Sequence, residues 1–324
     1  MRSVQMDATV PLASVKPLER MAAYRRYCLE ATRQALSGCQ LRRREHSPVG
    51  GARLEPVGDV EGFVYLRDPN TGSLFLRDLP DAARWASLLK QVNDYRHSPD
   101  TFHQQLASLR RDTVYAPKLA WIQETLRLQD LVRPRLLEVT TLPSRFTPVL
   151  QESGIFSEVV VSDEMALSAA SGVPGEQAVV QAAVLLESLD RVDDPAALLQ
   201  VVRNRLSAGG LLFVTALVSS GFDLSVLGLR SAYLYPPDRA NCFSRSGLEA
   251  LLRRVGFRLI EASTPGVLDV EIVQEHCRRD PTIALSRFER QILNADEETR
   301  AAFQSFLQQQ GLSSFTRIVA KREP

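Results

Sequence analysis

The sequence predicts an α/β protein whose main sheet is mostly parallel and twisted, preceded by a smaller helical region that carries a β-hairpin. After residue 134, short apolar segments typical of strands alternate with helical patterns, which indicates βαβ units. Before that point the pattern is mainly helical, and two strand-like arms flank one turn. The 324 residues are enough for a main domain and a smaller one. We expect these domains at residues 1–115 and 116–324.

The first region begins with an amphipathic helix, expected from Lys16 to Leu36, with Gly38 as its stop. Residues 62–79 contain two β-rich arms around Asp68-Pro69-Asn70-Thr71-Gly72, a composition typical of a hairpin turn. Several helical segments are expected between this hairpin and residue 131. The region is therefore predicted to be helical with one hairpin.

The second region alternates strands and helices, and its last strand is expected to be antiparallel in an otherwise parallel sheet. Strands are predicted at 136–139, 158–161, 182–186, 211–217, 257–262 and 314–320. Helices are predicted at 147–153, 195–206 and 246–255, with further helical material at 281–309. The Ala208-Gly209-Gly210 stretch is expected to end the second of these helices before the next strand begins.

Composition narrows the function classes. The 39 basic and 38 acidic side chains leave a net charge of +1, so no overall field favours nucleic acid or an anionic membrane. The one basic run, Arg42-Arg43-Arg44, is interpreted as a solvated helix end. Four cysteines without CxxC spacing predict free thiols in a reducing cytoplasm. The apolar run at 211–218 is far shorter than the roughly 20 residues of a membrane span, and the N-terminus lacks a signal-peptide pattern.

Four stretches carry a resemblance to a known family. They read "RLLEVTTLPSRF", "LLESLDRVDDPAALLQVVRNRLSAGGLLFVTAL", "YPPDRANCFSRSGLEALLRRVGFRLIEASTPG" and "FTRIVAKR". Together they resemble the class I S-adenosylmethionine-dependent methyltransferases, in particular a subgroup found with sugar and surface-polysaccharide biosynthesis genes. The resemblance covers about residues 130–322 and implies a Rossmann-like fold with S-adenosylmethionine as cofactor.

In that subgroup the hairpin often carries a zinc ribbon with a Cys-x-x-Cys-Gly motif. Here Asp68 and Thr71 stand at the two thiolate positions. Because structural zinc sites take four ligands, usually thiolates with imidazoles, we expect no metal and a hairpin kept without it.

The resemblance also assigns the cofactor residues. The family turn reads Glu-Val-Gly-x-Gly-x-Gly, so Thr140, Leu142 and Ser144 replace all three glycines, and we expect Leu142 or Pro143 to fill the space left by glycine. Acids are retained at two family positions, on the first strand and after the second, although both also suit solvated strand ends. The implied cofactor-binding set is Glu138, Thr140, Leu142, Ser144, Asp163 and Glu187.

The acceptor side departs from the family as well. Only 18 positions separate Asp163 from Gln181, where the family fits a strand and the adenine-contacting loop, so the adenine wall is expected to be truncated. Arg191 and Arg239 replace family histidines. We expect a crevice at the ends of the first, fourth and fifth strands, in which these arginines form an anion-binding rim or pair with nearby aspartates. Tyr235 and Asp238 are weak catalytic candidates, and no clear base is predicted.

Three functions remain open at this point. The first is a catalytically weak or inactive methyltransferase-fold protein that binds or scaffolds in a glycan or cell-surface pathway. The second is an active O-methyltransferase acting on a sugar or related small acceptor. The third is a crevice remodelled for another anionic ligand, such as a nucleotide sugar. The expected partner is a small-molecule or glycan-related ligand, or another protein, and the oligomeric state stays open.

Overall fold

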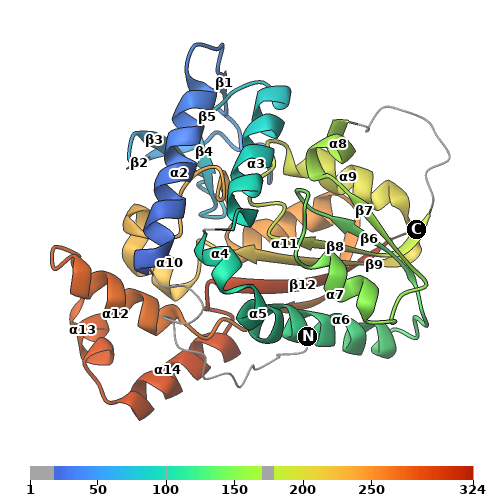
Figure 1. Ribbon diagram of the computed structural model, residues 1–324. Helices are drawn as coiled ribbons and strands as arrows, with labels where there is room; N and C mark the ends of the chain where they lie inside the picture. The colour runs from blue at the N-terminus through green and yellow to red at the C-terminus, as the bar shows by residue number, and fades with distance from the viewer. Residues whose placement is uncertain (1–17, 100, 170–178, 324) are drawn as a thin grey trace.

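A computed structural model describes residues 18–99, 101–169 and 179–323 (Figure 1). The expected helix start at residues 16–17, the N-terminal segment and part of the adenine segment lie outside the described residues. The main element is a six-stranded sheet with strand order β11-β12-β9-β8-β6-β7. The strands are β6 (Arg135–Val139), β7 (Glu158–Ser162), β8 (Val180–Leu186), β9 (Leu206–Leu217), β11 (Phe257–Ser263) and β12 (Phe315–Arg322).

Strand directions give this sheet a Rossmann-like α/β architecture. β6 is parallel to β7 and β8, and β8 is parallel to β9. β12 runs antiparallel to both β9 and β11. The predicted parallel sheet with one late antiparallel strand is therefore confirmed. Within the described residues β7 is the edge strand, next to the segment in which the adenine wall was expected to be short.

Successive side chains along each strand point to opposite faces of the sheet, and they contribute to two apolar clusters, one on each face. Leu137, Ala183 and Val214 contribute to the cluster that includes α9 (Pro195–Arg205) and α11 (Arg245–Arg254). Their neighbours in sequence contribute to the cluster that includes α6 (Ala116–Leu128) and α7 (Thr147–Glu152). Both faces of the sheet are thus covered by helices, which explains the nearly continuous apolar strands.

The predicted hairpin is confirmed, and it belongs to a small second sheet with strand order β10-β4-β3-β2. These strands are β2 (Glu55–Val60), β3 (Phe63–Arg67), β4 (Leu74–Leu76) and β10 (Asn241–Cys242). The Asp68 carboxylate accepts hydrogen bonds from the backbone N–H groups of Asn70 and Thr71 and from the Ser47 hydroxyl. Gly72, with φ of +76°, completes the turn. A side chain thus stabilises the turn where the family has metal ligands.

The two expected domains are closely joined. β10, from the second region, pairs antiparallel with β4 of the hairpin. The expected boundary after residue 115 falls inside a continuous helical run formed by α5 (Ala107–Arg110), the π-helical turn η1 (Arg111–Tyr115) and α6. The division at 115/116 therefore remains a prediction.

Helices α2 (Leu18–Leu36) and α3 (Ala82–His97) pack side by side (Figure 1). The short helix α4 (Phe102–Gln105) comes after α3 in the chain and contacts it. On the C-terminal side, α12 (Asp269–Arg279) packs with α10 (Phe222–Leu227) and α14 (Glu297–Gln309), and α14 with α13 (Arg287–Leu293). α10 and α12 were not expected from the sequence. Three buried β-branched residues in α12, Val270, Ile272 and Val273, weaken its helical pattern.

One strand boundary was also wrong. β9 begins at Leu206, so the two glycines expected to precede the strand lie inside it. The pairing of β8 with β9 jumps from Val180↔Leu206 to Ala182↔Leu211, which marks a bulge. Gly209 has a φ of +76°, and Gly210 lies close to two backbone carbonyls. The glycines therefore serve the bulge instead of a helix stop.

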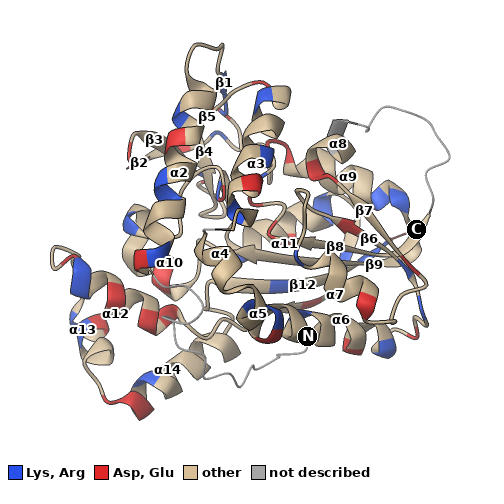
Figure 2. Ribbon diagram, viewed as in Figure 1, with Lys and Arg blue, Asp and Glu red and all other residues tan. Residues whose placement is uncertain are grey.

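Basic and acidic residues are mixed along the helices, for example on α2 and α12 (Figure 2). No helix within the described ranges has the length and apolar character needed to cross a bilayer. The four cysteines are unpaired, and two of them, Cys28 and Cys242, are buried.

Candidate functional site

A pocket of about 200 Å³ opens where β6, β8 and β9 end. It is bounded by the loop after β6, the segment 233–239 and the helices α2, α3 and α6. Carboxyl ends of parallel strands at a reversal of strand order are the usual ligand site of open α/β sheets. The lining includes these predicted site residues: Glu138, Thr140, Ser144, Glu187, Arg191, Tyr235, Asp238 and Arg239. Leu142 and Asp163 are not part of it.

Glu138 lies at the end of β6 and is buried. Its carboxylate accepts hydrogen bonds from the hydroxyl groups of Ser144, at 2.7 Å, and Thr147. Burial raises the pKa of Glu138, and these two hydroxyls partly offset the shift. Each oxygen of this carboxylate therefore already accepts one hydrogen bond, from the following loop and from the start of α7.

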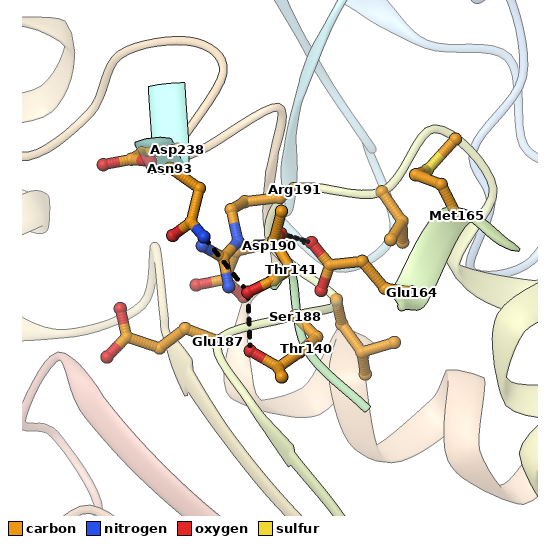
Figure 3. A network of polar contacts seen from close by, with 12 residues as sticks. Asn93, Thr140, Thr141, Glu164, Met165, Glu187, Ser188, Asp190, Arg191 and Asp238 are labelled. Atoms are coloured by element: carbon orange, nitrogen blue, oxygen red, sulfur yellow. Dashed lines mark hydrogen bonds and ion pairs between the residues drawn. The ribbon is translucent and has the colours of Figure 1, made fainter. Parts of the chain in front are cut away.

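The loop after β6 is held by side chains from other elements (Figure 3). Asn93 of α3 donates from its amide to the carbonyls of Thr141, at 3.2 Å, and Pro143, at 3.0 Å. The Thr141 hydroxyl donates to the buried Glu164 carboxylate. Pro143 lines the pocket, whereas Leu142 is 41% exposed and is not a lining residue. Of the two residues expected to fill the space of the lost glycines, Pro143 is the one at the pocket.

Asp163 has a local role. Its carboxylate accepts hydrogen bonds from the backbone N–H groups of Met165, at 3.0 Å, and Ala166, at 3.1 Å. These contacts start the short helix α8 (Glu164–Ala169). The carboxylate thus acts as a helix cap at the end of β7.

Arg239 is paired with two carboxylates. Its guanidinium lies 2.6 Å from the Glu187 carboxylate and 3.4 Å from the Asp190 carboxylate. Glu187 also lies 3.9 Å from the ammonium of Lys118. Asp190 is fully buried, and burial raises its pKa to about 8 although Arg239 acts in the opposite direction. The positive charge of Arg239 is thus compensated inside the pocket wall.

Arg191 is also compensated. Its Nε lies 3.7 Å from the buried Glu164 carboxylate, and its carbonyl accepts a hydrogen bond from the Trp85 indole at 2.8 Å. Of the two expected arrangements for Arg191 and Arg239, the structure shows pairing with carboxylates. The partners are Glu187, Asp190 and Glu164, and not Asp238 as was expected for part of this pairing.

Asp238 instead pairs with Arg96 of α3, whose guanidinium donates to both carboxylate oxygens at 2.7 and 2.8 Å. The hydroxyls of Tyr24 and Tyr235 lie 3.3 and 3.4 Å from the same carboxylate. Burial alone would raise the pKa of Asp238, but Arg96 and Arg239 outweigh it and hold the pKa below its usual range. Burial also raises the pKa of Tyr235 well above its usual range. Neither group suits a general base near neutral pH.

Much of the lining comes from residues before β6 that the sequence did not single out as site residues. Asn93, Arg96 and His97 are spaced at i, i+3 and i+4 on α3, so they share one helix face. Polar residues that continue the apolar face formed by Trp85, Leu88, Leu89 and Val92 are the signal that could have indicated them. The further lining residues from this region are Met21, Tyr24, Phe102, His103, Arg110, Tyr115 and Lys118.

Among the described residues, no group of three or more histidine, cysteine, aspartate or glutamate side chains could hold a metal ion. At the hairpin, the Asp68 carboxylate is occupied by its own turn.

Comparison with known proteins finds a match to one family model and to several solved structures. A family model described as "Methyltransferase domain" matches residues 110–262. No curated protein matches the chain. Similar solved structures include the 1,6-didemethyltoxoflavin-N1-methyltransferase of Burkholderia thailandensis, with 11% identity over 83% of this chain and 100% of that chain and a TM-score of 0.44.

Two further similar structures are the plantazolicin methyltransferase BpumL and an S-adenosylmethionine-dependent methyltransferase from Thermotoga maritima. The first has 13% identity over 75% of this chain and 96% of that chain, with a TM-score of 0.41. The second has 14% identity over 74% of this chain and 100% of that chain, with a TM-score of 0.39. Residues 110–262 of this chain thus match a methyltransferase domain. They include the parallel strands β6, β7, β8 and β9 of the Rossmann-like sheet.

Proposed function

We propose that this chain is a methyltransferase-fold protein that is weak or inactive in methyl transfer and acts by binding a small ligand. The observation that carries the proposal is that polar groups expected to hold the cofactor are already satisfied within the chain. Ser144 and Thr147 bind Glu138, Asn93 binds the loop carbonyls, and Asp163 caps α8.

These contacts disfavour the cofactor energetically. A ligand group that replaces an existing internal hydrogen bond gains little net free energy, because one bond is exchanged for another. Glu138 already accepts a hydroxyl on each oxygen, so a bond to the cofactor's amino group would add less free energy than it would at a carboxylate without partners. The loop would also have to move against the two bonds from Asn93. Binding of S-adenosylmethionine should therefore be weak.

An active O-methyltransferase is the second candidate, and a specific observation favours it besides the family match. The pocket lining includes His97 and His103. His97 Nδ1 lies 2.9 Å from the Asn93 carbonyl, so this nitrogen donates and Nε2 is left as an acceptor. Burial lowers the pKa of both histidines, which keeps them neutral. His97 would be the base in that case.

Titration calorimetry with S-adenosylmethionine and S-adenosylhomocysteine separates the two candidates. Under the proposal, the full chain binds both with a Kd weaker than about 1 mM. The variant N93A, which frees the loop carbonyls, should bind more tightly than the unaltered chain if the internal bonds are what excludes the cofactor. A Kd near about 10 µM for the unaltered chain would overturn the proposal and favour the methyltransferase.

We propose a glycan or cell-surface biosynthesis pathway because the sequence resembles the subgroup associated with such genes. A cytoplasmic location is proposed from the four unpaired cysteines. The alternative to a small ligand in this proposal is a protein partner from that pathway.

A further inference from the structure

The pocket has more positive than negative side chains. Three carboxylates line it, those of Glu138, Glu187 and Asp238. The basic lining residues are Arg96, Arg110, Lys118, Arg145, Arg191 and Arg239. Four of these six lie within ion-pair distance of a carboxylate, as described above. Within the described part of the chain, Arg110 and Arg145 form no ion pair with a carboxylate.

Arg145 is fixed in place by backbone groups. Its two terminal nitrogens donate to the carbonyls of His103, at 2.7 Å, and Arg96, at 3.1 Å. Its Nε is buried and has no hydrogen-bond partner among the described residues. Burial lowers the pKa of Arg145; Tyr115 acts in the opposite direction, and the charges of Arg110 and Arg96 lower the pKa further. A rigid guanidinium beside like charges and without a carboxylate is costly unless an anion compensates it.

Arg110 and the two histidines share this part of the pocket. Burial lowers the pKa of His103, and the nearby positive charges of Arg96, Arg110 and Arg145 lower it further. The Nε2 atoms of His97 and His103 are buried without a hydrogen-bond partner among the described residues. Positively charged side chains therefore lie at the end of the pocket near α3 and α4, together with ring nitrogens that have no hydrogen-bond partner among the described residues.

We propose that Arg110 and Arg145, with His103 beside them, form a subsite for the phosphate group of a small-molecule ligand. The inference rests on the proposed function, because it places a ligand other than S-adenosylmethionine in the same pocket. Two uncompensated guanidinium groups match the charge of a phosphate dianion, and a guanidinium binds phosphate oxygens through paired N–H groups. This subsite differs from the anion-binding rim that was one alternative for Arg191 and Arg239, whose charges are already compensated.

Calorimetry on the full chain with inorganic phosphate and pyrophosphate tests the subsite. Both should bind, and the variant R110Q should lose affinity by about tenfold. The matched control is R111Q, because Arg111 is the next residue, is more than half exposed and pairs with Glu152 on the surface. R111Q should bind as the unaltered chain does. R145K keeps the charge but loses the planar fork, and it should weaken pyrophosphate binding as well.

Several results would overturn the inference. One is a lack of phosphate and pyrophosphate binding to the unaltered chain. Another is an equal loss in R110Q and R111Q, which would indicate general electrostatics. A third is acetate binding that depends on Arg110 while phosphate binding does not, which would assign the subsite to a carboxylate.

The failure of this inference can be told apart from the failure of the proposed function. If S-adenosylmethionine binds tightly and R110Q weakens it, the subsite holds the cofactor's carboxylate and both statements are wrong. If neither S-adenosylmethionine nor the phosphates bind, the phosphate subsite is wrong while the low cofactor affinity stands. Titration of S-adenosylmethionine and of the phosphates into the unaltered chain and the three variants therefore gives a separate answer to each question.

Discussion

At the scale of single residues, several ionisable side chains are buried in or next to the pocket wall. Asp190 is the clearest case, because it is fully buried and one of its carboxylate oxygens, Oδ1, has no hydrogen-bond partner among the described residues. The other oxygen accepts from the Leu217 backbone N–H at 3.2 Å. Its nearest cation, Arg239, lies closer to Glu187. The carboxyl group is therefore more stable with its proton than without it.

This makes Asp190 a source of pH dependence. Its pKa is raised from 3.8 to about 8 in the folded chain, so between these values the folded state holds a proton that the unfolded state has lost. The free energy of unfolding should therefore fall as pH rises from about 4 to about 8. The variant D190N has no such proton and should show a smaller fall.

Denaturant unfolding of both proteins at about pH 5 and about pH 8 gives the measurement. D94N is a suitable control, since Asp94 is half exposed and pairs only with Lys90 on the surface of α3. Its curves should follow those of the unaltered chain. If D190N loses as much stability with rising pH as the unaltered chain, Asp190 does not carry the proton.

At the scale of elements, the bulge in β9 has a specific steric requirement. A Cβ atom on Gly210 would lie 2.9 Å from the Ser207 carbonyl oxygen and 3.1 Å from the Gln181 carbonyl oxygen. Both atoms are backbone, so neither can turn away as a side chain would. The variant G210A should lower the free energy of unfolding by about 1–3 kcal/mol. Gly50 is the matched control because a Cβ there meets nothing within 4 Å.

Denaturant unfolding of G210A and G50A checks this prediction. G50A should change stability by less than about 1 kcal/mol in either direction. Equal stability of the two variants would mean that the β8–β9 bulge adapts to the added methyl group.

Much at this scale could be predicted from the sequence. β6 and β8 are mainly apolar and each is followed by a helical pattern, and residues 211–217 of β9 form an apolar run, so the strands and the sheet type could both be predicted. The bulge was not readable, because Gly209-Gly210 also suits a helix end. β10 is only two residues long and has no pattern of its own.

The charge balance of the site could not be predicted for a different reason. Arg96 and Asp238 are 142 positions apart, and Arg239 and Glu187 are 52 apart. A sequence shows which residues are basic, but only the fold shows which of them meet a carboxylate. The sequence therefore left open whether Arg191 and Arg239 bind an anion or pair with nearby aspartates, and Arg110 and Arg145 were not considered.

At the scale of the whole molecule, Asn241 joins the region before β6 to the main sheet. Its amide nitrogen donates to the carbonyls of Leu189, at 2.8 Å, and Val192, at 2.7 Å. Its amide oxygen accepts from the Arg44 guanidinium at 2.7 Å. Arg44 also donates to the Asp193 carbonyl at 2.9 Å. Together with the β4–β10 ladder, the two Arg44 contacts cross the predicted boundary at residue 115.

Because of these contacts we expect the regions on both sides of that boundary to unfold together. The chain has two tryptophans, Trp85 in α3 and Trp121 in α6, one on each side of it. In the variants W121F and W85F, the remaining tryptophan should report the same denaturant midpoint as the far-ultraviolet circular dichroism of that variant. The comparison is made within each variant, so any loss of stability caused by the substitution cancels. A tryptophan midpoint that differs from the dichroism midpoint would instead indicate two independently folding domains divided near residue 115.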